Sequence, residues 1–183
     1  MNYKIHFLLL TIVYISFGCN QIYSQVQYGG APKSFQVSKK LIKDSCINIK
    51  GVSIQVPPPA CSEDDEIIGK AIKVDFTLDN SGVWLELEDG DRIWQLKLST
   101  TSSSSLSVLY KEFELAEGSE LYFYSCDKTE VLGSYTFRNN NKYNIFQTGK
   151  ISGECVIVEL YEPKYVRRKS YFEIFEVGYF FRS

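Results

Sequence analysis

From residue 72 onward, apolar and polar side chains alternate along most of this 183-residue chain. In residues 72–79 every second residue is apolar, and the residues between carry a charge or a hydroxyl group, as in the sequence IKVDFTLD. Successive side chains of a β-strand point to opposite faces, so this period of two indicates a strand with one buried and one solvated face. No stretch longer than a turn or two keeps the period of an amphipathic helix. The chain is therefore expected to form β-sheet.

Polar turns divide the alternating region into short strands. Two of these turns, Asn80-Ser81-Gly82 and Asp89-Gly90-Asp91, have the composition of tight hairpin connections. The chain also contains 13 Tyr and 12 Phe, which favour pleated, half-buried surfaces. About eight short strands predict an all-β fold, an antiparallel β-sandwich or jelly roll. The expected strands are residues 72–79, 83–88, 92–99, 106–110, 120–126, 131–137, 154–161 and 170–181.

The two tryptophans stand in different positions relative to the apolar faces of their expected strands. Trp94 alternates in step with Leu96 and Leu98, which predicts that its ring packs in the core. Trp84 stands opposite the apolar face of its strand and in step with Glu86. Trp84 is thus the candidate for a partner-facing aromatic residue, although packing at the surface or between strands is the simpler interpretation.

The first 24 residues have the pattern of an export signal peptide. Lys4 supplies a positive charge, residues 7–17 (FLLLTIVYISF) form a short apolar run, and small and polar residues follow. We expect cleavage after Ser24, which leaves an exported chain in the periplasm, on the outer surface or in the medium. Lipidation at Cys19 is the less favoured alternative, because the residues before Gly18 fit a lipoprotein signal poorly. No later apolar run approaches the length of a transmembrane helix.

Residues 25–66 lack the alternation that marks the β-sandwich domain of residues 67–183. This segment carries glycines, a triple proline and an acidic run, and we expect it to lie extended across something larger. The acidic run is a candidate for contact with a basic cleft on a partner, although a solvated linker is its simpler interpretation. Its residues lack the spacing of a calcium loop and are Glu63, Asp64, Asp65 and Glu66.

Four cysteines follow the expected cleavage site: Cys46, Cys61, Cys126 and Cys155. An even number of cysteines in an exported chain predicts two disulfides, for which three connectivities exist. One of them pairs Cys46 with Cys61 and links two strands through Cys126 and Cys155. Free, buried cysteines are the alternative.

The composition excludes several classes of function. The net charge of −2 and the pI near 5.5 give no electrostatic footprint for nucleic acid. The only histidine, His6, lies in the leader, so the exported chain lacks the usual general base and the commonest zinc ligand. We therefore expect no cofactor, no metal site and no Ser-His-Asp or Cys-His catalysis. Catalysis by carboxylates alone remains open in principle.

Several short motifs, in their order along the chain, carry a resemblance to a known family. They are residues 28–35 (YGGAPKSF), 90–94 (GDRIW), 113–115 (FEL), 117–118 (EG) and 139–140 (NN). Together they resemble the region that precedes the catalytic domain in exported bacterial trypsin-fold serine proteases of the lysyl-endopeptidase type. The likeness covers nearly all of the chain after the leader, and residues 173–179 look like the final strand before the protease would begin.

The resemblance implies a prodomain-like β-sandwich that assists the folding of a protease, holds it inactive or directs its export. The sequence contains no GDSGG nucleophile loop and no catalytic histidine motif, so no peptidase residue of the family is carried onto this chain. We accordingly expect a non-catalytic protein whose partner is a trypsin-like protease domain. The alternative is an independent secreted module that binds carbohydrate or another cell-surface ligand.

Overall fold

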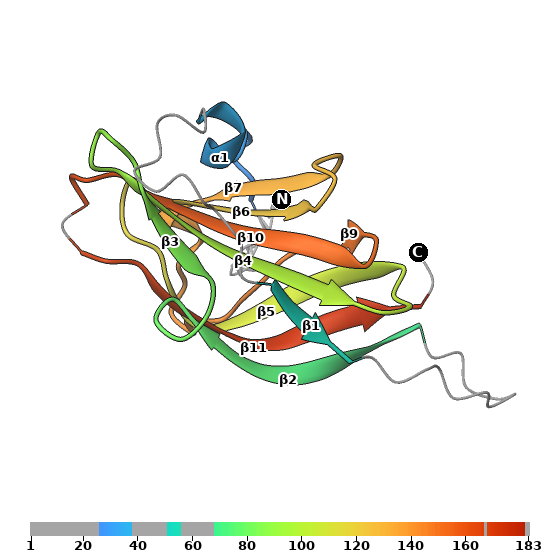
Figure 1. Ribbon diagram of the computed structural model, residues 1–183. Coiled ribbons are helices and arrows are strands. Elements are labelled where there is room, and N and C mark those ends of the chain that lie inside the picture. Colours follow the sequence, from blue (N-terminus) through green and yellow to red (C-terminus); the bar gives the residue numbers. More distant parts are fainter. Residues whose placement is uncertain (1–25, 38–50, 56–67, 167, 182–183) are drawn as a thin grey trace, which may run out of the picture.

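Two β-sheets pack face to face in the computed structural model, which describes residues 26–37, 51–55, 68–166 and 168–181 (Figure 1). The six-stranded sheet has the order β1-β4-β10-β6-β7, and β3 pairs with β4 alongside β1. Its strands are β1 (Gly51–Ile54), β3 (Val83–Glu86), β4 (Arg92–Thr100), β6 (Glu120–Ser125), β7 (Val131–Tyr135) and β10 (Cys155–Glu162).

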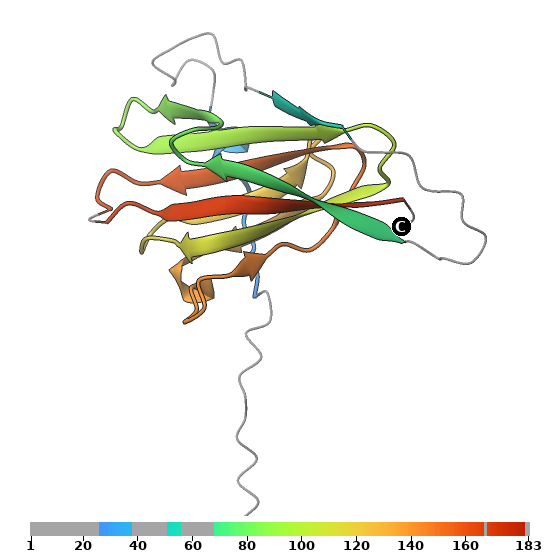
Figure 2. The same cartoon turned by 90° about the horizontal axis from the view of Figure 1, so that it is seen from below.

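The five-stranded sheet has the order β2-β11-β5-β8, and β9 also pairs with β5. In Figure 2 this sheet faces the viewer, with β11 in red between β2 and β5. Its strands are β2 (Gly69–Thr77), β5 (Ser105–Glu114), β8 (Phe146–Gln147), β9 (Ile151–Ser152) and β11 (Tyr171–Phe180). Short helices are α1 (Lys33–Gln36) and a 3-10 helix (Phe137–Asn139).

The expected all-β sandwich is confirmed, although the described residues contain eleven strands where about eight were expected. Strands β8 and β9 have two residues each, too few to show an alternating pattern. Strand β1 lies within residues 25–66, and its pairing with β4 is the one parallel pair among the strands of the described residues. Alternation of apolar and polar residues identifies long strands. It misses short strands, which are extended because they pair with a neighbouring strand.

The core between the sheets contains the expected face of β4. Trp94, Leu96 and Leu98 have no exposed surface, and the Trp94 ring meets Phe172 of the other sheet edge-on at 5.6 Å. The indole nitrogen of Trp94 donates a hydrogen bond to the Ser81 carbonyl at 2.9 Å. This close approach requires Gly82, whose φ is +69° and where a Cβ would lie 2.6 Å from the indole ring.

Strand β3 presents the face opposite to the one its sequence indicated. Trp84 lies directly across from Trp94 in the β3–β4 pairing, so its ring packs toward the core between the sheets. Leu85 and Ile93 point to the outer side, where Val37 packs against them. The apolar face of β3 is therefore buried by the N-terminal segment, which the pattern within β3 alone could not reveal.

A disulfide joins Cys126 at the end of β6 to Cys155 at the start of β10, 29 residues apart in sequence. The backbone amide of Cys126 also donates to the Cys155 carbonyl, so the disulfide links two residues that are already joined by a backbone hydrogen bond. This bond confirms one of the two expected disulfides. Cys46 and Cys61 lie outside the described residues.

Residues 26–37, here called the strap, cross the outer face of the six-stranded sheet (Figure 1). Tyr28 donates its amide to the Ser134 carbonyl at 3.1 Å, and the Ser134 amide donates to the Gly29 carbonyl at 2.9 Å, so the strap pairs with β7. Farther along, Phe35 packs edge-on against Tyr124 at 5.0 Å. The strap thereby gives this sheet face a covering layer. No helix in the described part of the chain is long and apolar enough to cross a membrane.

Candidate functional site

A buried carboxylate fastens the strap to the six-stranded sheet. Glu159 of β10 has no exposed surface, and its oxygens accept hydrogen bonds from the Ser34 amide at 3.0 Å and the Ser34 hydroxyl at 2.5 Å. Gln95 Nε2 and the Tyr124 hydroxyl each donate to the same carboxylate at 2.8 Å. Ser34 therefore holds the strap in one register on the sheet. Its acceptor, Glu159, lies 125 residues later in the sequence.

The strap cleft, a cleft of about 650 Å³, lies between the strap and the sandwich. Gly29, Gly30 and Lys33 of the strap line one side, and residues of the β5–β6 connection, β6, β7, the 3-10 helix and β10 line the rest. Gly30 lies so close to β6 that a Cβ there would come within 2.8 Å of the Tyr122 hydroxyl. The absence of a side chain at residue 30 thus lets the strap backbone form a wall of this cleft.

The corner cleft, of about 740 Å³, adjoins the strap cleft at Gly118 and Phe137, which line both. Three connections from one end of the sandwich form it: the β5–β6 corner, the 3-10 helix after β7 and the β10–β11 loop. Residues far apart in the sequence therefore meet at one surface.

Large aromatic side chains are exposed around the two clefts. Tyr165 is 71% exposed, Tyr28 46% and Phe137 38%. The Tyr165 ring lies against Gly118, where a Cβ would approach its hydroxyl to 3.2 Å. Exposed aromatic surface of this kind, concentrated at concave sites with polar neighbours, is typical of surfaces that bind a partner.

Cationic side chains stand among these rings. The guanidinium carbon of Arg138 lies 5.7 Å from the Tyr28 ring centroid and 5.8 Å from that of Phe137. Lys33 Nζ lies 5.0 Å from the centroid of Tyr161. In the corner cleft, Arg168 forms an exposed ion pair with Glu114 at 2.9 Å. The clefts thus combine aromatic rings with charged groups of both signs, and Lys33 and Arg138 outnumber Glu120 in the strap cleft.

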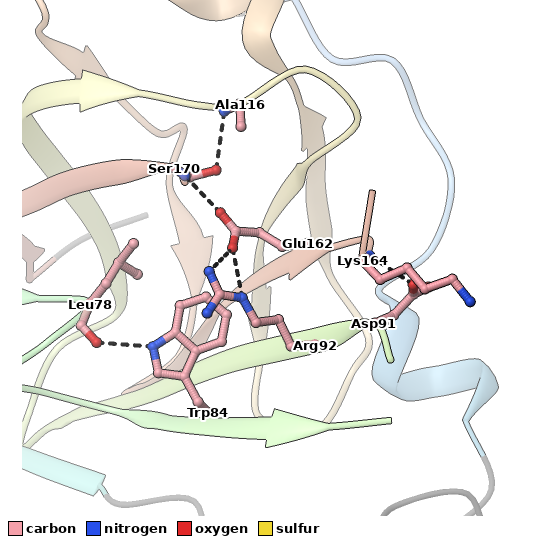
Figure 3. Close-up of polar contacts among 8 residues, drawn as sticks. All are labelled: Leu78, Trp84, Asp91, Arg92, Ala116, Glu162, Lys164 and Ser170. Carbon is pink, nitrogen blue, oxygen red and sulfur yellow. Dashed lines mark hydrogen bonds and ion pairs between the residues drawn. The ribbon is translucent and has the colours of Figure 1, made fainter. Parts of the chain in front are cut away.

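A second buried carboxylate, Glu162, fixes the connections that shape the corner cleft (Figure 3). Its Oε2 accepts from the Arg92 guanidinium, and its Oε1 accepts the Ser170 amide at 2.7 Å. The Ser170 hydroxyl in turn accepts the Ala116 amide at 3.1 Å. One network therefore ties β4, the β10–β11 loop and the β5–β6 corner together, and the cleft walls depend on it.

Asp91 anchors the β3–β4 turn to the β10–β11 loop. Its carboxylate accepts from the Tyr161 hydroxyl and, at 3.0 Å, from the Lys164 amide (Figure 3 shows the Lys164 contact). Burial by itself raises the pKa of Asp91, but these bonds and the charges of Lys33 and Lys164 outweigh it and hold the pKa below its usual value. Asp91 is consequently a stable anion at neutral pH.

The tyrosines of the outer sheet face act as hydrogen-bond donors rather than bases. Burial, together with the nearby carboxylates, raises the pKa of Tyr122 and of Tyr124 well above the usual value. Both phenols therefore stay protonated at neutral pH, and they donate to Glu120 and Glu159 respectively. Among the described residues no group of three or more His, Cys, Asp or Glu side chains could hold a metal ion.

Of the sequence-predicted site residues that the structure describes, Trp84, Cys126 and Cys155, none lines either cleft. The Trp84 indole donates to the Leu78 carbonyl at 3.1 Å, and the Arg92 guanidinium covers its ring at 4.1 Å from the centroid (Figure 3). The acidic run from Glu63 to Glu66 falls outside the described ranges. Sequence reasoning missed Phe137, Arg138 and Tyr165, which stand at strand ends or in polar connections. An aromatic residue within an otherwise polar turn is the signal that could have identified them.

The chain matches no model of a known protein family and no curated protein. Among solved structures, it is similar to PliG of Aeromonas hydrophila, a periplasmic lysozyme inhibitor of g-type lysozyme. The TM-score is 0.28 and the sequence identity is 8%, over 72% of this chain and 96% of that one. A likeness at this level carries no conclusion about function.

Proposed function

We propose that this protein is an exported, non-catalytic β-sandwich that binds another protein through the corner cleft and the strap cleft. The observation that supports this proposal is the group of exposed rings Tyr28, Phe137 and Tyr165 around two adjoining clefts. Aromatic and arginine side chains are enriched in the centres of protein interfaces, where they supply most of the binding free energy. The disulfide is typical of proteins that fold in an oxidising compartment and fits export.

The partner that we propose is a trypsin-fold serine protease domain of the lysyl-endopeptidase type. The support comes from the resemblance in the sequence, and two of its motifs, residues 28–35 and 117–118, contribute residues to the clefts. A domain of this kind would assist the folding of the protease, hold it inactive or direct its export. The exported chain has no histidine, so it should not cleave lysyl or arginyl peptide substrates by itself.

Binding to a purified protease domain of that type tests the proposal. We expect a complex by isothermal titration calorimetry, and Phe137→Ser or Tyr165→Ser should weaken it about tenfold or more, as loss of an interface anchor does. Tyr143→Ser is the matched control, because Tyr143 is 70% exposed but lines neither cleft. Absence of a complex, or equal effects of all three substitutions, would show that the proposal is wrong.

A carbohydrate ligand is the second candidate. The corner cleft supports it, since Tyr165 and Phe137 offer exposed rings there, and sugars stack on such rings. A glycan array separates the two candidates. Specific hits that are lost in Tyr165→Ser, together with no protease complex, would favour carbohydrate.

A further inference from the structure

The strap cleft carries two positive charges and one negative charge on its lining side chains. Lys33 and Arg138 are the cations, and Glu120 is the acid. Glu120 already accepts a hydrogen bond from the Tyr122 hydroxyl at 2.9 Å. Neither cation forms an ion pair with another residue of the described ranges, and the nearby Asp91 is occupied by Tyr161 and Lys164. The cleft therefore has positive charge available for a ligand.

Arg138 is held in place in a way that suits recognition of a carboxylate. Its guanidinium group lies near two rings, those of Tyr28 and Phe137, on the strap and the 3-10 helix. Contacts with ring faces restrict a guanidinium without using its N–H groups. A planar guanidinium with free N–H groups pairs with a carboxylate through two parallel hydrogen bonds.

The cleft is also shaped for an extended chain. The strap cleft continues into the corner cleft through Gly118 and Phe137. Exposed rings flank the basic position on both sides, Tyr28 in one cleft and Tyr165 in the other. A segment in which acidic and apolar side chains follow one another would place its carboxylate at Arg138 and its apolar groups on the rings.

We propose that the strap cleft is a carboxylate-binding subsite that takes an acidic side chain from an extended segment of the protein partner. This inference rests on the proposed function and adds the chemistry that the partner must present. Arg138 and Lys33 pair with the carboxylate.

A pair of fluorescein-labelled peptides tests the inference by fluorescence polarisation at low ionic strength. In one peptide Glu and Tyr alternate, and in the other Gln replaces each Glu. We expect the Glu peptide to bind about tenfold more tightly, the size of effect that a charge-assisted pair gives. Arg138→Gln should remove that preference.

Lys142→Gln is the matched control, because Lys142 lies 4.8 Å from the Tyr143 ring but lines neither cleft. Urea unfolding of each variant checks that the fold is retained. Equal affinity for the two peptides, or a preference that survives Arg138→Gln, would overturn the subsite. If the protease complex still forms and still depends on Phe137, only the subsite is wrong. If no complex forms either, the proposed function falls with it.

Discussion

Replacement of Glu159 should show how strongly the strap is held to the sandwich. The four hydrogen bonds to the Glu159 carboxylate contribute about 1.5–3 kcal/mol each, and burial of the carboxylate without a cationic partner in the described structure costs several kcal/mol. Truncation in Glu159→Ala removes both the hydrogen bonds and the cost of burying the carboxylate. Gln95 Nε2 already donates to the Tyr124 hydroxyl at 3.1 Å and keeps that bond, whereas Ser34 loses both of its bonds to Glu159 and keeps only a 3.4 Å contact between its hydroxyl and that of Tyr124.

We therefore expect Glu159→Ala to lower the free energy of unfolding by about 2–4 kcal/mol, mostly from the unpaired groups and the space left behind. Urea unfolding followed by tryptophan fluorescence measures this loss. Hydrogen exchange measures the effect on the strap itself. The substitution should increase the exchange rate of the Ser34 amide by a larger factor than the exchange rates of amides in β4. Glu117→Ala, an exposed carboxylate, should change stability by no more than about 0.5 kcal/mol. A loss in Glu159→Ala below about 1 kcal/mol would refute the reasoning.

Three further predictions follow from the fold. Reduction of Cys126–Cys155 should lower the free energy of unfolding by about 3–4 kcal/mol, because the unfolded chain regains the entropy of an open loop between residues 29 apart. Urea unfolding with and without reductant measures this loss. Gly82→Ala should destabilise the protein by about 1–3 kcal/mol more than Gly153→Ala, because both glycines have positive φ but only Gly82 faces an indole ring; equal thermal shifts would contradict this. The lowered pKa of Asp91 means that its contribution is complete above about pH 3.9 and is lost as the pH falls through the lower folded value, so acid unfolding of Asp91→Asn should depend less steeply on pH in that range.

The sequence could predict those parts of the fold that depend on residues near one another in the chain. Trp94, Leu96 and Leu98 lie on the buried face that their spacing indicated, because β4 is long enough to show its period. Glu159 and Trp84 show the limit of such reasoning. Each occupies a position where alternation indicates solvent, and each is covered by side chains or backbone from elsewhere in the chain.

The clefts could not be predicted for a related reason. Phe137, Tyr165 and Gly118 belong to three separate connections, and their proximity depends on the order of strands in the six-stranded sheet. The cleft walls depend further on Glu162, whose partners Arg92 and Ser170 come from different strands or their flanks. Period and composition describe one strand at a time, so they carry no information about which loops meet at an end of the sandwich.

The strap has a consequence for the order in which the molecule assembles. Residues near Ser34 leave the ribosome before the strands on which they rest, since their acceptor lies 125 residues later. A contact of such sequence separation forms late, because the long intervening loop must first be closed by other structure. We therefore expect the strap, although it precedes the sandwich in the sequence, to be among the last parts to dock. Until then, the tyrosine-rich side of the six-stranded sheet is open to chaperones or to a neighbouring chain.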